Sequence, residues 1–525
     1  MAAQRVVLGL DVGTSAVKAV AFGIGSRWRC CVVHDYPSRE SPRGRDEQDP
    51  RTILDTAIRA LAECVAAAAS GEVVGIAVST AMHGLIGLDD RCEPITPLVT
   101  WADARAGAEA RTLRASGLAR DLHRRTGAPV HPMTPLTKLR WFARHEPGTF
   151  AEARWWVGLK DYVLWGLTGR LVTELSSAGG TGMLDLATQS WSAEALAVAG
   201  VDAERLPPVL PTTATLPLAA EPARRIGLPP GTPVVLGAAD GPLSNLGTGA
   251  VAPGVAGVSL GTSGAVRMML ARPRVDEEGS LFCYALTEDS WVLGGAVSNG
   301  GLVVRWAASA VAPDVVAQSP DRHPEDAVLD LAADVPPGAD GLVVLPYLVA
   351  ERAPLWDPSL PGAVLGLRLE HTRAHLVRAC VEGVCLQLAA VLDRLDALVP
   401  VTAVRATGGA LRSPVWREVL AAVLDRPLTI VDSAEGTALG AAALGLYALG
   451  LAASPQAGAE SLIDTGDDPG DVVVARPELV ATYRRLRASV AELADGLGRA
   501  VAALAPTTST RQAGPTGGER STTVR

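Results

Sequence analysis

The sequence lacks the features that mark three other classes of protein. Its seven cysteines are scattered over 525 residues without a CxxC pair, which argues against a disulfide framework and against a zinc site. It contains no basic run, and its net charge of −9 predicts that nucleic acid is not a partner. No apolar run approaches the length of a membrane span, and no basic-then-apolar leader precedes the first strand. We therefore expect a cytoplasmic protein that does not enter a membrane.

Lysine is scarce as well. Of the 47 basic residues only Lys18, Lys138 and Lys160 are lysine, and the others are arginine. A genome-wide coding bias produces such a skew wherever the two residues are interchangeable. We therefore expect the remaining lysines to stand where a compact ammonium group is required.

The length and composition indicate a packed enzyme of two domains. Hydrophobic residues make up 48% and charged residues 20% of the chain, as in globular proteins. A chain of 525 residues is too long for one core and fits two domains of about 250 residues. We place them at 1–250 and 251–504, in an α/β fold, with long helices over Asp49–Ala69 and Thr372–Leu398. Residues 505–525 have no apolar periodicity, and we expect a disordered tail there.

The N-terminal stretch VVLGLDVGTSAVKAVAF, Val6–Phe22, predicts a β-hairpin with a small-residue tip. The tip consists of Gly13, Thr14 and Ser15. Its backbone N–H groups, its two hydroxyls and Lys18 on the return strand can hold a phosphate. Asp11 at the mouth would repel a bare phosphate, so its presence predicts a divalent cation between the two. An ordinary hairpin without a ligand is the alternative, because short glycine-rich motifs also arise by chance.

The same triplet recurs half a chain later, within Val258–Leu270. It reads Gly261, Thr262 and Ser263. Arg267 on the return strand stands where the first copy has Lys18, offset by one residue. Two phosphate-type turns at this separation suggest two similar domains that face one nucleotide, an arrangement similar to that of the sugar-kinase and actin superfamily. The second copy has no equivalent of Asp11, so we expect the metal on the first domain alone.

The segment after the predicted strand Val73–Ser79 carries candidate sugar-binding residues. Met82 and His83 lie just beyond the carboxyl end of this strand, where open α/β sheets build their pockets. An isolated Met-His pair is also compatible with an ordinary core and rim. Trp101 can offer a polyol both an apolar wall and an N–H donor.

Other charged residues of the first half are better explained by structure than by chemistry. Asp103 and Arg105 are spaced for a local ion pair. Glu174 precedes a small-residue stretch, Ser176–Gly182, that predicts a loop. We interpret Glu174 as a hydrogen-bond acceptor for that loop rather than as a catalytic residue.

The stretch TPVVLGAADGPLSNLGTGA, Thr232–Ala250, contains the candidate catalytic base. Its apolar run ends in Asp240, and Gly241, Pro242 and a helix-like segment follow. Aspartate before Gly-Pro is common as a helix cap or turn residue. Here, however, Asp240 ends a strand shortly before the second phosphate turn, so its carboxylate can face the transferring phosphoryl group. It can then contact the substrate and accept the proton of an attacking hydroxyl.

The C-terminal half predicts the adenosine site. A strand at Val401–Ala406 precedes the Gly408-Gly409 turn, and a helix begins at Ser413. Glycines allow the backbone to approach a flat ring or a ribose closely, so we assign Gly408, Gly409 and Ser413 to nucleotide binding. The small-faced stretch Glu435–Gly445 predicts a helix packed beneath this turn.

Together these segments resemble the FGGY family of carbohydrate kinases over about Arg5–Leu497. The motifs that carry the resemblance are the D-x-G-T-S stretch with Lys18, Met82-His83-Gly84, Trp101-x-Asp103-x-Arg105, Lys160-Asp161-Tyr162, Ala239-Asp240-Gly241, Gly261-Thr262-Ser263-Gly264 and Thr407-Gly408-Gly409. The resemblance implies two ribonuclease-H-like domains with a central cleft, ATP and Mg²⁺ as cofactors, a small-molecule sugar or sugar acid as substrate, and Asp240 as the base.

Further motifs bear on the substrate. The segments that look most like gluconate kinases are His131-Pro132-Met133 and Glu351-Arg352-Ala353-Pro354-x-Trp356, and they imply phosphorylation of D-gluconate to 6-phospho-D-gluconate. Met82-His83-Gly84 is shared with xylulose kinases, and many gluconate kinases have a serine in place of Gly84. A xylulokinase, or another FGGY pentulose or polyol kinase, is therefore the alternative.

Two readings from other classes also remain. An ATPase switch like actin or Hsp70 would share the domains and turns but needs no sugar pocket. A catalytically inactive regulatory homologue would not need both Asp11 and Asp240. A homodimer is compatible with the sequence.

Overall fold

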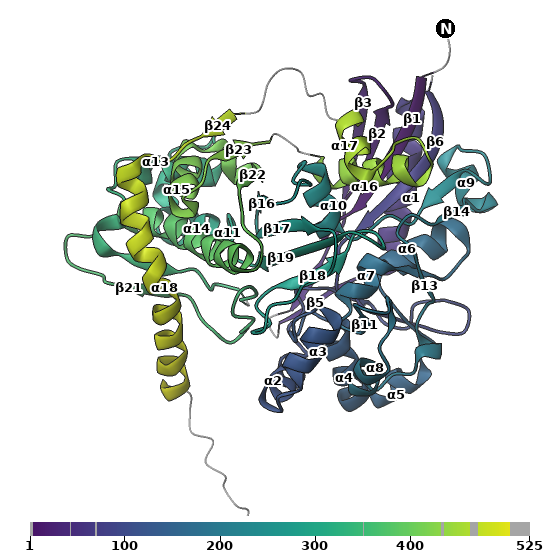
Figure 1. Ribbon diagram of the computed structural model, residues 1–525, viewed down its shortest axis with the longest axis horizontal. Coiled ribbons are helices and arrows are strands. Elements are labelled where there is room, and N and C mark those ends of the chain that lie inside the picture. Colours follow the sequence, from purple (N-terminus) through teal and green to yellow (C-terminus); the bar gives the residue numbers. More distant parts are fainter. Residues whose placement is uncertain are drawn as a thin grey trace, which may run out of the picture.

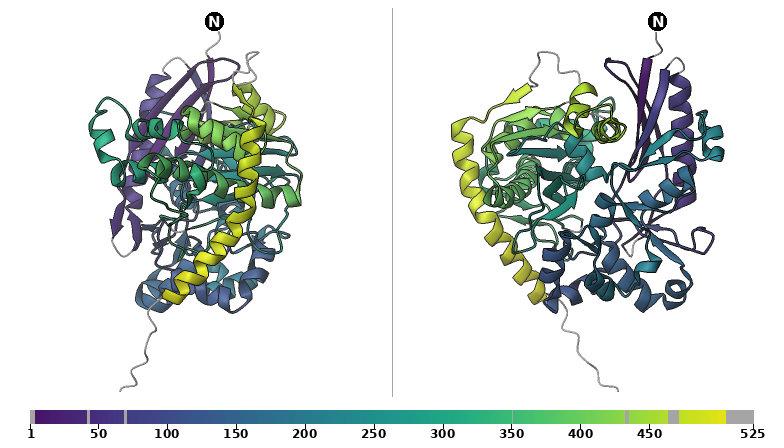
Figure 2. Two further views of the ribbon diagram at one scale, coloured as in Figure 1. Left: turned by 90° about the vertical axis from the view of Figure 1, so that its left-hand side faces the viewer. Right: turned by 45° about the vertical axis from the view of Figure 1, so that its right-hand side comes forward.

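The computed structural model describes residues 4–41, 44–68, 71–349, 351–431, 435–462 and 471–504. The chain forms two halves, each built on a mixed β-sheet with helices on its faces (Figure 1). The two halves lie side by side in Figure 1 and in the right-hand view of Figure 2. The expected tail, 505–525, lies outside the described residues.

The first half contains a six-stranded sheet in the order β14-β15-β6-β1-β2-β3. Its strands are β1 (Gln4–Val12), β2 (Ala16–Gly23), β3 (Arg29–Asp35), β6 (Gly71–Thr80), β14 (Thr215–Pro217) and β15 (Pro233–Val235). The helices that bury apolar side chains against one face of the sheet are α1 (Pro50–Ala67), α6 (Leu159–Thr168) and α9 (Ala220–Ile226). The shorter strands are β4 (Arg39–Ser41), β5 (Arg45–Gln48), β7 (Ile86–Leu88), β8 (Leu98–Val99), β9 (Trp155–Val157), β10 (Thr173–Glu174), β11 (Leu184–Asp185), β12 (Ser190–Trp191) and β13 (Val209–Leu210). The remaining helices are α2 (Gly107–Ala115), α3 (Leu118–Thr126), α4 (Pro135–His145), α5 (Pro147–Glu152), α7 (Leu175–Gly180), α8 (Ala193–Ala199) and α10 (Asp240–Gly247).

The second half contains a seven-stranded sheet in the order β18-β19-β17-β16-β22-β23-β24. Its strands are β16 (Val255–Leu260), β17 (Gly264–Leu270), β18 (Phe282–Ala285), β19 (Trp291–Val297), β22 (Ala403–Thr407), β23 (Leu428–Ile430) and β24 (Asp471–Val473), and a separate pair is formed by β20 (Val343–Leu345) and β21 (Ala363–Leu365). The helices are α11 (Leu302–Ala310), α12 (Pro313–Ala317), α13 (Pro324–Ala333), α14 (Arg373–Leu398), α15 (Pro414–Leu424), α16 (Gly436–Ala448), α17 (Pro455–Leu462) and α18 (Pro477–Leu504).

The two sheets share one topology over six strands. The order β3-β2-β1-β6-β15-β14 in the first half corresponds to β19-β17-β16-β22-β23-β24 in the second. The strand directions correspond as well. In each half the first strand, β1 or β16, begins an antiparallel meander of three strands. On its other side it pairs with two successive parallel strands, and an antiparallel strand, β14 or β24, forms the edge. The two GTS triplets therefore occupy equivalent turns, which confirms the expectation of two similar α/β domains.

Helix α16 belongs to the second half by sequence but lies on the sheet of the first. It contacts β1, β6 and α10, and Figure 1 shows it between the two sheets. The approach to β1 requires glycine at position 9, because a Cβ there would collide with the carbonyl oxygen of Ala438. The small residues along this helix thus let it fill the space between the halves.

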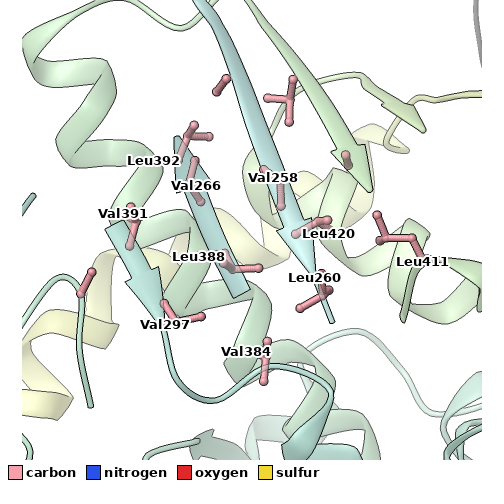
Figure 3. Close-up of a cluster of buried hydrophobic side chains, with 14 of the residues drawn as sticks. Val258, Leu260, Val266, Val297, Val384, Leu388, Val391, Leu392, Leu411 and Leu420 are labelled. Atoms are coloured by element: carbon pink, nitrogen blue, oxygen red, sulfur yellow. The ribbon is translucent and has the colours of Figure 1, made fainter. Parts of the chain in front are cut away.

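The core of the second half lies between its sheet and α14. Val258, Leu260 and Val266 from the sheet face Val384 and Leu388 of the helix (Figure 3). These side chains are at most 1% exposed, and truncating one such leucine to alanine typically costs about 2–5 kcal/mol. By length and composition α14 could cross a membrane, but 83% of its apolar window is buried inside the protein.

The expected elements differ from the structure in two places that matter for the site. The stretch Ser176–Gly182 was expected to be a loop, but α7 extends to Gly180. The strand expected to end at Asp240 ends at Val235, and Asp240 is the first residue of α10. The expected helix over Thr372–Leu398 is confirmed as α14, with Thr372 as its N-cap.

Candidate active site

The first GTS turn is held by side chains that bind its carbonyl and hydroxyl oxygens. The Tyr36 hydroxyl donates to the carbonyl of Gly13. Gln48 Nε2 donates to the carbonyl of Thr14 over 2.6 Å, and Trp101 Nε1 donates to Thr14 Oγ1 over 2.9 Å. Among the described residues, the amides of Thr14 and Ser15 have no acceptor. Free amides at a tight turn form an anion-binding concavity, so this turn can hold a phosphate.

The second GTS turn is braced by the start of α11. The amides of Gly300 and Leu302 donate to the carbonyl of Thr262 over 3.1 and 3.2 Å, and Gly301 N donates to Gly261 O over 2.8 Å. These bonds fix the turn against a helix N-terminus, whose partial positive charge favours an anion.

Asp11 and Asp240 are close enough for the charge of one to act on the pKa of the other. Asp11 lies on β1 directly opposite Lys18 on β2. Burial, together with the charge of Asp240, raises the pKa of Asp11 to about 7. Burial also raises the pKa of Asp240, whereas Arg267 acts to lower it. Two carboxylates that influence each other in a buried site are suited to hold a cation or to exchange a proton.

Arg267 lies beside Asp240 on the side of the second half. Its Nη1 donates to Ser259 Oγ over 3.2 Å, and its buried Nε has no hydrogen-bond partner among the described residues. A Cβ at Gly241, the residue after Asp240, would lie 3.4 Å from this Nε. The structure therefore brings an unpaired donor next to the candidate base, where a phosphoryl group can accept from it.

His83 is fixed as a neutral hydrogen-bonding residue. Its backbone has a positive φ of 65°, which is uncommon outside glycine and often marks functional sites. Nδ1 lies 2.7 Å from the carbonyl oxygen of Gly180, so Nδ1 carries the ring proton. Nε2 can therefore accept a hydrogen bond from a hydroxyl group. Burial lowers the pKa of His83 to about 3, which keeps the ring neutral.

Trp101 and Met82 line one small cavity together with Thr14 of the first turn. This places the predicted sugar residues directly beside the predicted phosphate turn. Trp101 Nε1 donates to Thr14 Oγ1, so a polyol would compete with Thr14 for this donor, and the binding of a polyol by Trp101 stays a prediction. The guanidinium of Arg352 lies over the ring, so the part of the ring that Arg352 leaves uncovered can form an apolar wall for a sugar.

A cavity of about 250 Å³ opens beside the second turn. Of the predicted nucleotide residues, Gly261, Thr262 and Gly409 line it, whereas Ser413 does not and instead serves as the N-cap residue of α15. Gly408 has a φ of +123°, and a Cβ there would collide with the carbonyl oxygen of Leu260. The cavity is also lined by residues that the sequence analysis did not select, namely Val304, Arg305, His323, Glu325, Asp326, Leu329, Ala410, Arg412 and Trp416. A flat base and a ribose fit such a mixed apolar and charged lining.

Comparison with known proteins gives the family of this arrangement. Residues 6–247 match the N-terminal domain of the FGGY family of carbohydrate kinases, and residues 256–449 match its C-terminal domain. The chain belongs to the FGGY family of carbohydrate kinases. As an FGGY kinase it is an ATP-dependent phosphotransferase that acts on a small carbohydrate.

The relatives of this FGGY kinase that are described next are named as kinases of gluconate or of xylulose. A gluconokinase from Bacillus licheniformis is 38% identical over 449 residues, which are 85% of this chain and 88% of that protein. A gluconate kinase structure from Lactobacillus acidophilus matches with a TM-score of 0.86 at 33% identity, over 94% of this chain and 98% of the other. The ligand-bound structure of a xylulose kinase from the same organism matches with a TM-score of 0.87 at 33% identity, over the same shares of each chain.

Two of the three lysines of this FGGY kinase are buried hydrogen-bond donors that hold the site together. Lys160 is 1% exposed, and its ammonium group donates to the carbonyls of Leu236 and Ala238, both over 2.9 Å, and to that of Val78. Lys138 is fully buried and donates to the carbonyls of His83 and Thr100, both over 2.7 Å. Three converging carbonyls suit a compact ammonium group better than a planar guanidinium. This agrees with the expectation that the few lysines stand where an ammonium group is required.

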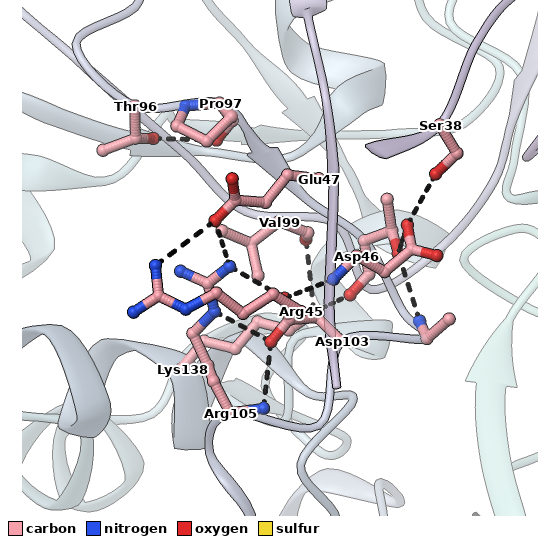
Figure 4. Close-up of polar contacts among 12 residues, drawn as sticks. Ser38, Arg45, Asp46, Glu47, Thr96, Pro97, Val99, Asp103, Arg105 and Lys138 are labelled. Carbon is pink, nitrogen blue, oxygen red and sulfur yellow. Dashed lines mark hydrogen bonds and ion pairs between the residues drawn. The ribbon is translucent and has the colours of Figure 1, made fainter. Parts of the chain in front are cut away.

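The ion pair of Asp103 and Arg105 is confirmed as structural. Arg105 Nη2 lies 2.8 Å from Asp103 Oδ2, and it also contacts Glu47 (Figure 4). Asp103 in turn accepts from the backbone N of Asp46 over 2.8 Å. Figure 4 shows Lys138 beside this pair, and Lys138 in turn binds the carbonyl of His83, so the network supports the backbone of a candidate sugar residue.

Glu174 is confirmed as a structural acceptor. Its carboxylate accepts from the backbone N of Ser176 over 2.5 Å and of Ser177 over 3.0 Å, and it thereby caps α7. This cap explains why the small residues that follow form a helix, since it satisfies amides that a helix start leaves open.

The residues around Asp11 fit a magnesium ion. Asp11 Oδ1 is buried and has no hydrogen-bond partner among the described residues, so it lacks the neutralising contact that a buried carboxylate oxygen requires. No cluster of three histidine, cysteine or acidic side chains occurs in the described parts of the chain. Mg²⁺ is commonly bound by one or two carboxylates together with phosphate oxygens and water, which is the ligand set that Asp11 offers.

Proposed function

We propose that this FGGY kinase transfers the γ-phosphate of ATP to the terminal 6-hydroxyl of D-gluconate and forms 6-phospho-D-gluconate. The observation that carries the proposal is the setting of Asp240, a partly buried carboxylate at the start of α10 whose charge interacts with Asp11 of the first half and with Arg267 of the second. A carboxylate in that place has the charge and surroundings of a base in phosphoryl transfer.

The proposed reaction follows from the charges around Asp240. The 6-hydroxyl of the substrate donates its proton to the Asp240 carboxylate as its oxygen attacks the γ-phosphorus in line. Arg267 and the amides of the two turns bind phosphate oxygens and stabilise the charge that spreads over them. Lys18, opposite Asp11 in the hairpin, contributes a further positive charge at the γ-phosphate. Mg²⁺ held by Asp11 would neutralise phosphate charge when it is bound.

The neutral His83 and the Trp101 face support a polyol next to that hydroxyl. Nε2 of His83 accepts a sugar hydroxyl, and Trp101 together with Met82 forms the apolar side of the pocket. The choice of gluconate is supported by the gluconokinase relative at 38% identity. Xylulose is the second candidate, favoured by the Met82-His83-Gly84 motif and by the xylulose kinase structure of equal identity to the gluconate kinase structure.

The cellular setting follows from the chemistry. All seven cysteines are free thiols in the structure, which suits a reducing compartment. The proposed reaction consumes ATP in the same compartment. We therefore propose a cytoplasmic enzyme.

A coupled assay of ADP release tests the proposed function. The purified full chain, with ATP and Mg²⁺, is supplied in turn with D-gluconate, D-xylulose, D-ribulose and glycerol. We expect the highest kcat/KM with D-gluconate. A preference for D-xylulose would move the assignment to the second candidate, and ATP turnover that no sugar stimulates would contradict a sugar kinase and favour a nucleotide switch.

A further inference from the structure

A second buried arginine, Arg352, lies against one of the candidate sugar residues. Arg352 is 8% exposed, and its guanidinium carbon lies 4.6 Å from the centroid of the Trp101 ring. Arg352 comes from the second half of the chain and Trp101 from the first, so this contact spans the cleft. Arg267, by contrast, lies beside Asp240. The charges of Arg267 and Asp240 also act on Arg352, so the two guanidinium groups belong to one site, with Arg352 at Trp101 and Arg267 at Gly241.

The loop around Arg352 holds its guanidinium in a fixed orientation. Nε donates to Ser298 Oγ and Nη2 donates to the carbonyl of Val297, both over 3.0 Å. The neighbouring Glu351 is fully buried, and its Oε1 accepts from Gln387 Nε2 of α14 over 3.1 Å. Since only Nε and Nη2 have acceptors among the described residues, Nη1 remains for a ligand. A donor held in this way loses little conformational freedom on binding.

The guanidinium of Arg352 has no direct ion-pair partner among the described residues, although the charges of Asp240 and Glu351 act on it from farther away. No carboxylate of the described residues lies within ion-pair distance of it, and its polar contacts are neutral oxygens. A buried charge without a counter-charge is costly. A carboxylate on the sugar would supply the direct ion-pair partner that Arg352 lacks.

Tyr284 is a second unpaired group beside the candidate sugar residues. Its hydroxyl is buried and has no hydrogen-bond partner among the described residues, and its ring packs edge-on against His83 with 5.8 Å between the ring centroids. Arg352 is close enough for its charge to act on the pKa of Tyr284. Two unpaired donors beside the sugar wall form a site for an acceptor that carries negative charge, as a carboxylate does.

We propose that Arg352 binds the C1 carboxylate of the substrate and thereby selects a sugar acid over neutral sugars. The inference rests on the proposed function, in which D-gluconate is the substrate. An open-chain aldonate has its carboxylate at the end opposite to its 6-hydroxyl, so binding at Arg352 directs that hydroxyl toward Asp240. Neutral ketoses and polyols lack the group that Arg352 requires.

The test compares D-gluconate with D-glucitol, which differs only in having a hydroxymethyl group in place of the carboxylate. The values of kcat/KM for both compounds are measured for the wild type, for Arg352→Gln and for the exposed control Arg368→Gln. We expect Arg352→Gln to lower kcat/KM for D-gluconate by about 10²-fold, because a buried charge partner is lost, and to change the value for D-glucitol much less. The control variant should retain the wild-type ratio of the two substrates.

An equal loss on both substrates would overturn the inference, because it would mean that Arg352 braces the loop or acts on the phosphoryl group. A wild type that uses both compounds equally well would overturn it without any variant. If Arg352→Gln does not fold, as judged by circular dichroism, Arg352→Lys keeps the charge but loses the planar fork, and an unchanged ratio in that variant would overturn the inference. A preference for D-xylulose over D-gluconate is a separate result, which contradicts the proposed function, whereas the gluconate-to-glucitol ratio reports on Arg352 alone.

Discussion

The ammonium group of Lys160 lies 2.9 Å from the carbonyl oxygen of Ala238, two residues before Asp240. The same group binds the carbonyls of Leu236 and, on β6, Val78. One lysine on α6 thus fixes the backbone that leads to the candidate base. The position of Asp240 is set by this contact as well as by the start of α10.

Lys160→Met should lower both stability and turnover. It leaves three buried carbonyls without a donor, and each unsatisfied group costs about 1–3 kcal/mol. Thermal unfolding measures the loss of stability, and steady-state kinetics should show a lower kcat because Asp240 is no longer held in place. Lys138→Met is the matched control, since it frees the carbonyls of His83 and Thr100 instead and should raise the sugar KM more than it lowers kcat. Identical kinetic changes in the two variants would contradict separate roles.

Asp11→Asn should remove the effect of magnesium on nucleotide binding. Ligands that bind the folded state raise its melting temperature, so a non-hydrolysable ATP analogue should stabilise the wild type more with Mg²⁺ than without it. In Asp11→Asn the two melting temperatures should coincide, whereas the exposed control Asp90→Asn should behave like the wild type. A magnesium-dependent shift that survives in Asp11→Asn would place the metal elsewhere.

His83 should make the protein less stable in acid. The unfolded chain protonates this residue below its usual pKa of 6.5, whereas the folded protein does so only below about 3. Between these values the unfolded state binds the additional proton, so the free energy of unfolding falls as the pH falls, by about 1.4 kcal/mol per pH unit. This contribution is fully present above pH 6.5. Urea unfolding at several pH values should show that the stability difference between the wild type and His83→Gln shrinks toward low pH. A constant difference for His83→Gln would mean that the residue is not held neutral.

Arg114 joins the two halves across the mouth of the cleft. Its Nη2 donates to the carbonyl of Leu355 over 3.0 Å, and its Nη1 donates to that of Trp356. Both acceptors lie in the loop that carries Arg352, so Arg114→Ala should weaken closure of the halves and raise the sugar KM by roughly three- to tenfold, as expected for hydrogen bonds from a charged donor. Small-angle scattering should show a larger radius of gyration in the variant. Arg111→Ala, on the same helix and also exposed, is the control, and equal effects in both variants would contradict the assignment.

The sequence was informative where a short motif determines a local structure. The two GTS triplets predicted the hairpins, and their repetition predicted two sheets of one topology, because each hairpin has the same role in its sheet. The sequence put Asp11 at the mouth of the hairpin and Lys18 on the return strand, and the structure pairs these two residues directly. The scarcity of lysine predicted the need for an ammonium group at Lys138 and Lys160.

Contacts between distant segments could not be predicted from local patterns. Arg352 meets Trp101 across 251 positions of the chain, and Tyr284 meets His83 across 201 positions. The motif around Arg352 was recognised, but no local feature indicated where its side chain would lie. The helix at Ser176–Gly180 was missed because small residues favour loops, and the carboxylate cap of Glu174 outweighs that tendency. The left-handed backbone of His83 has no signature in its sequence.

The turnover and sugar affinity of Asp240→Asn test the central claim most directly. The amide keeps the size of the carboxylate and one acceptor oxygen but cannot accept the proton of the sugar hydroxyl. We predict a loss in kcat of about 10²-fold or more, while the dissociation constant for D-gluconate, measured by calorimetry on the same folded variant, stays close to that of the wild type. A variant that turns over at nearly the wild-type rate would contradict the assignment of Asp240 as the base.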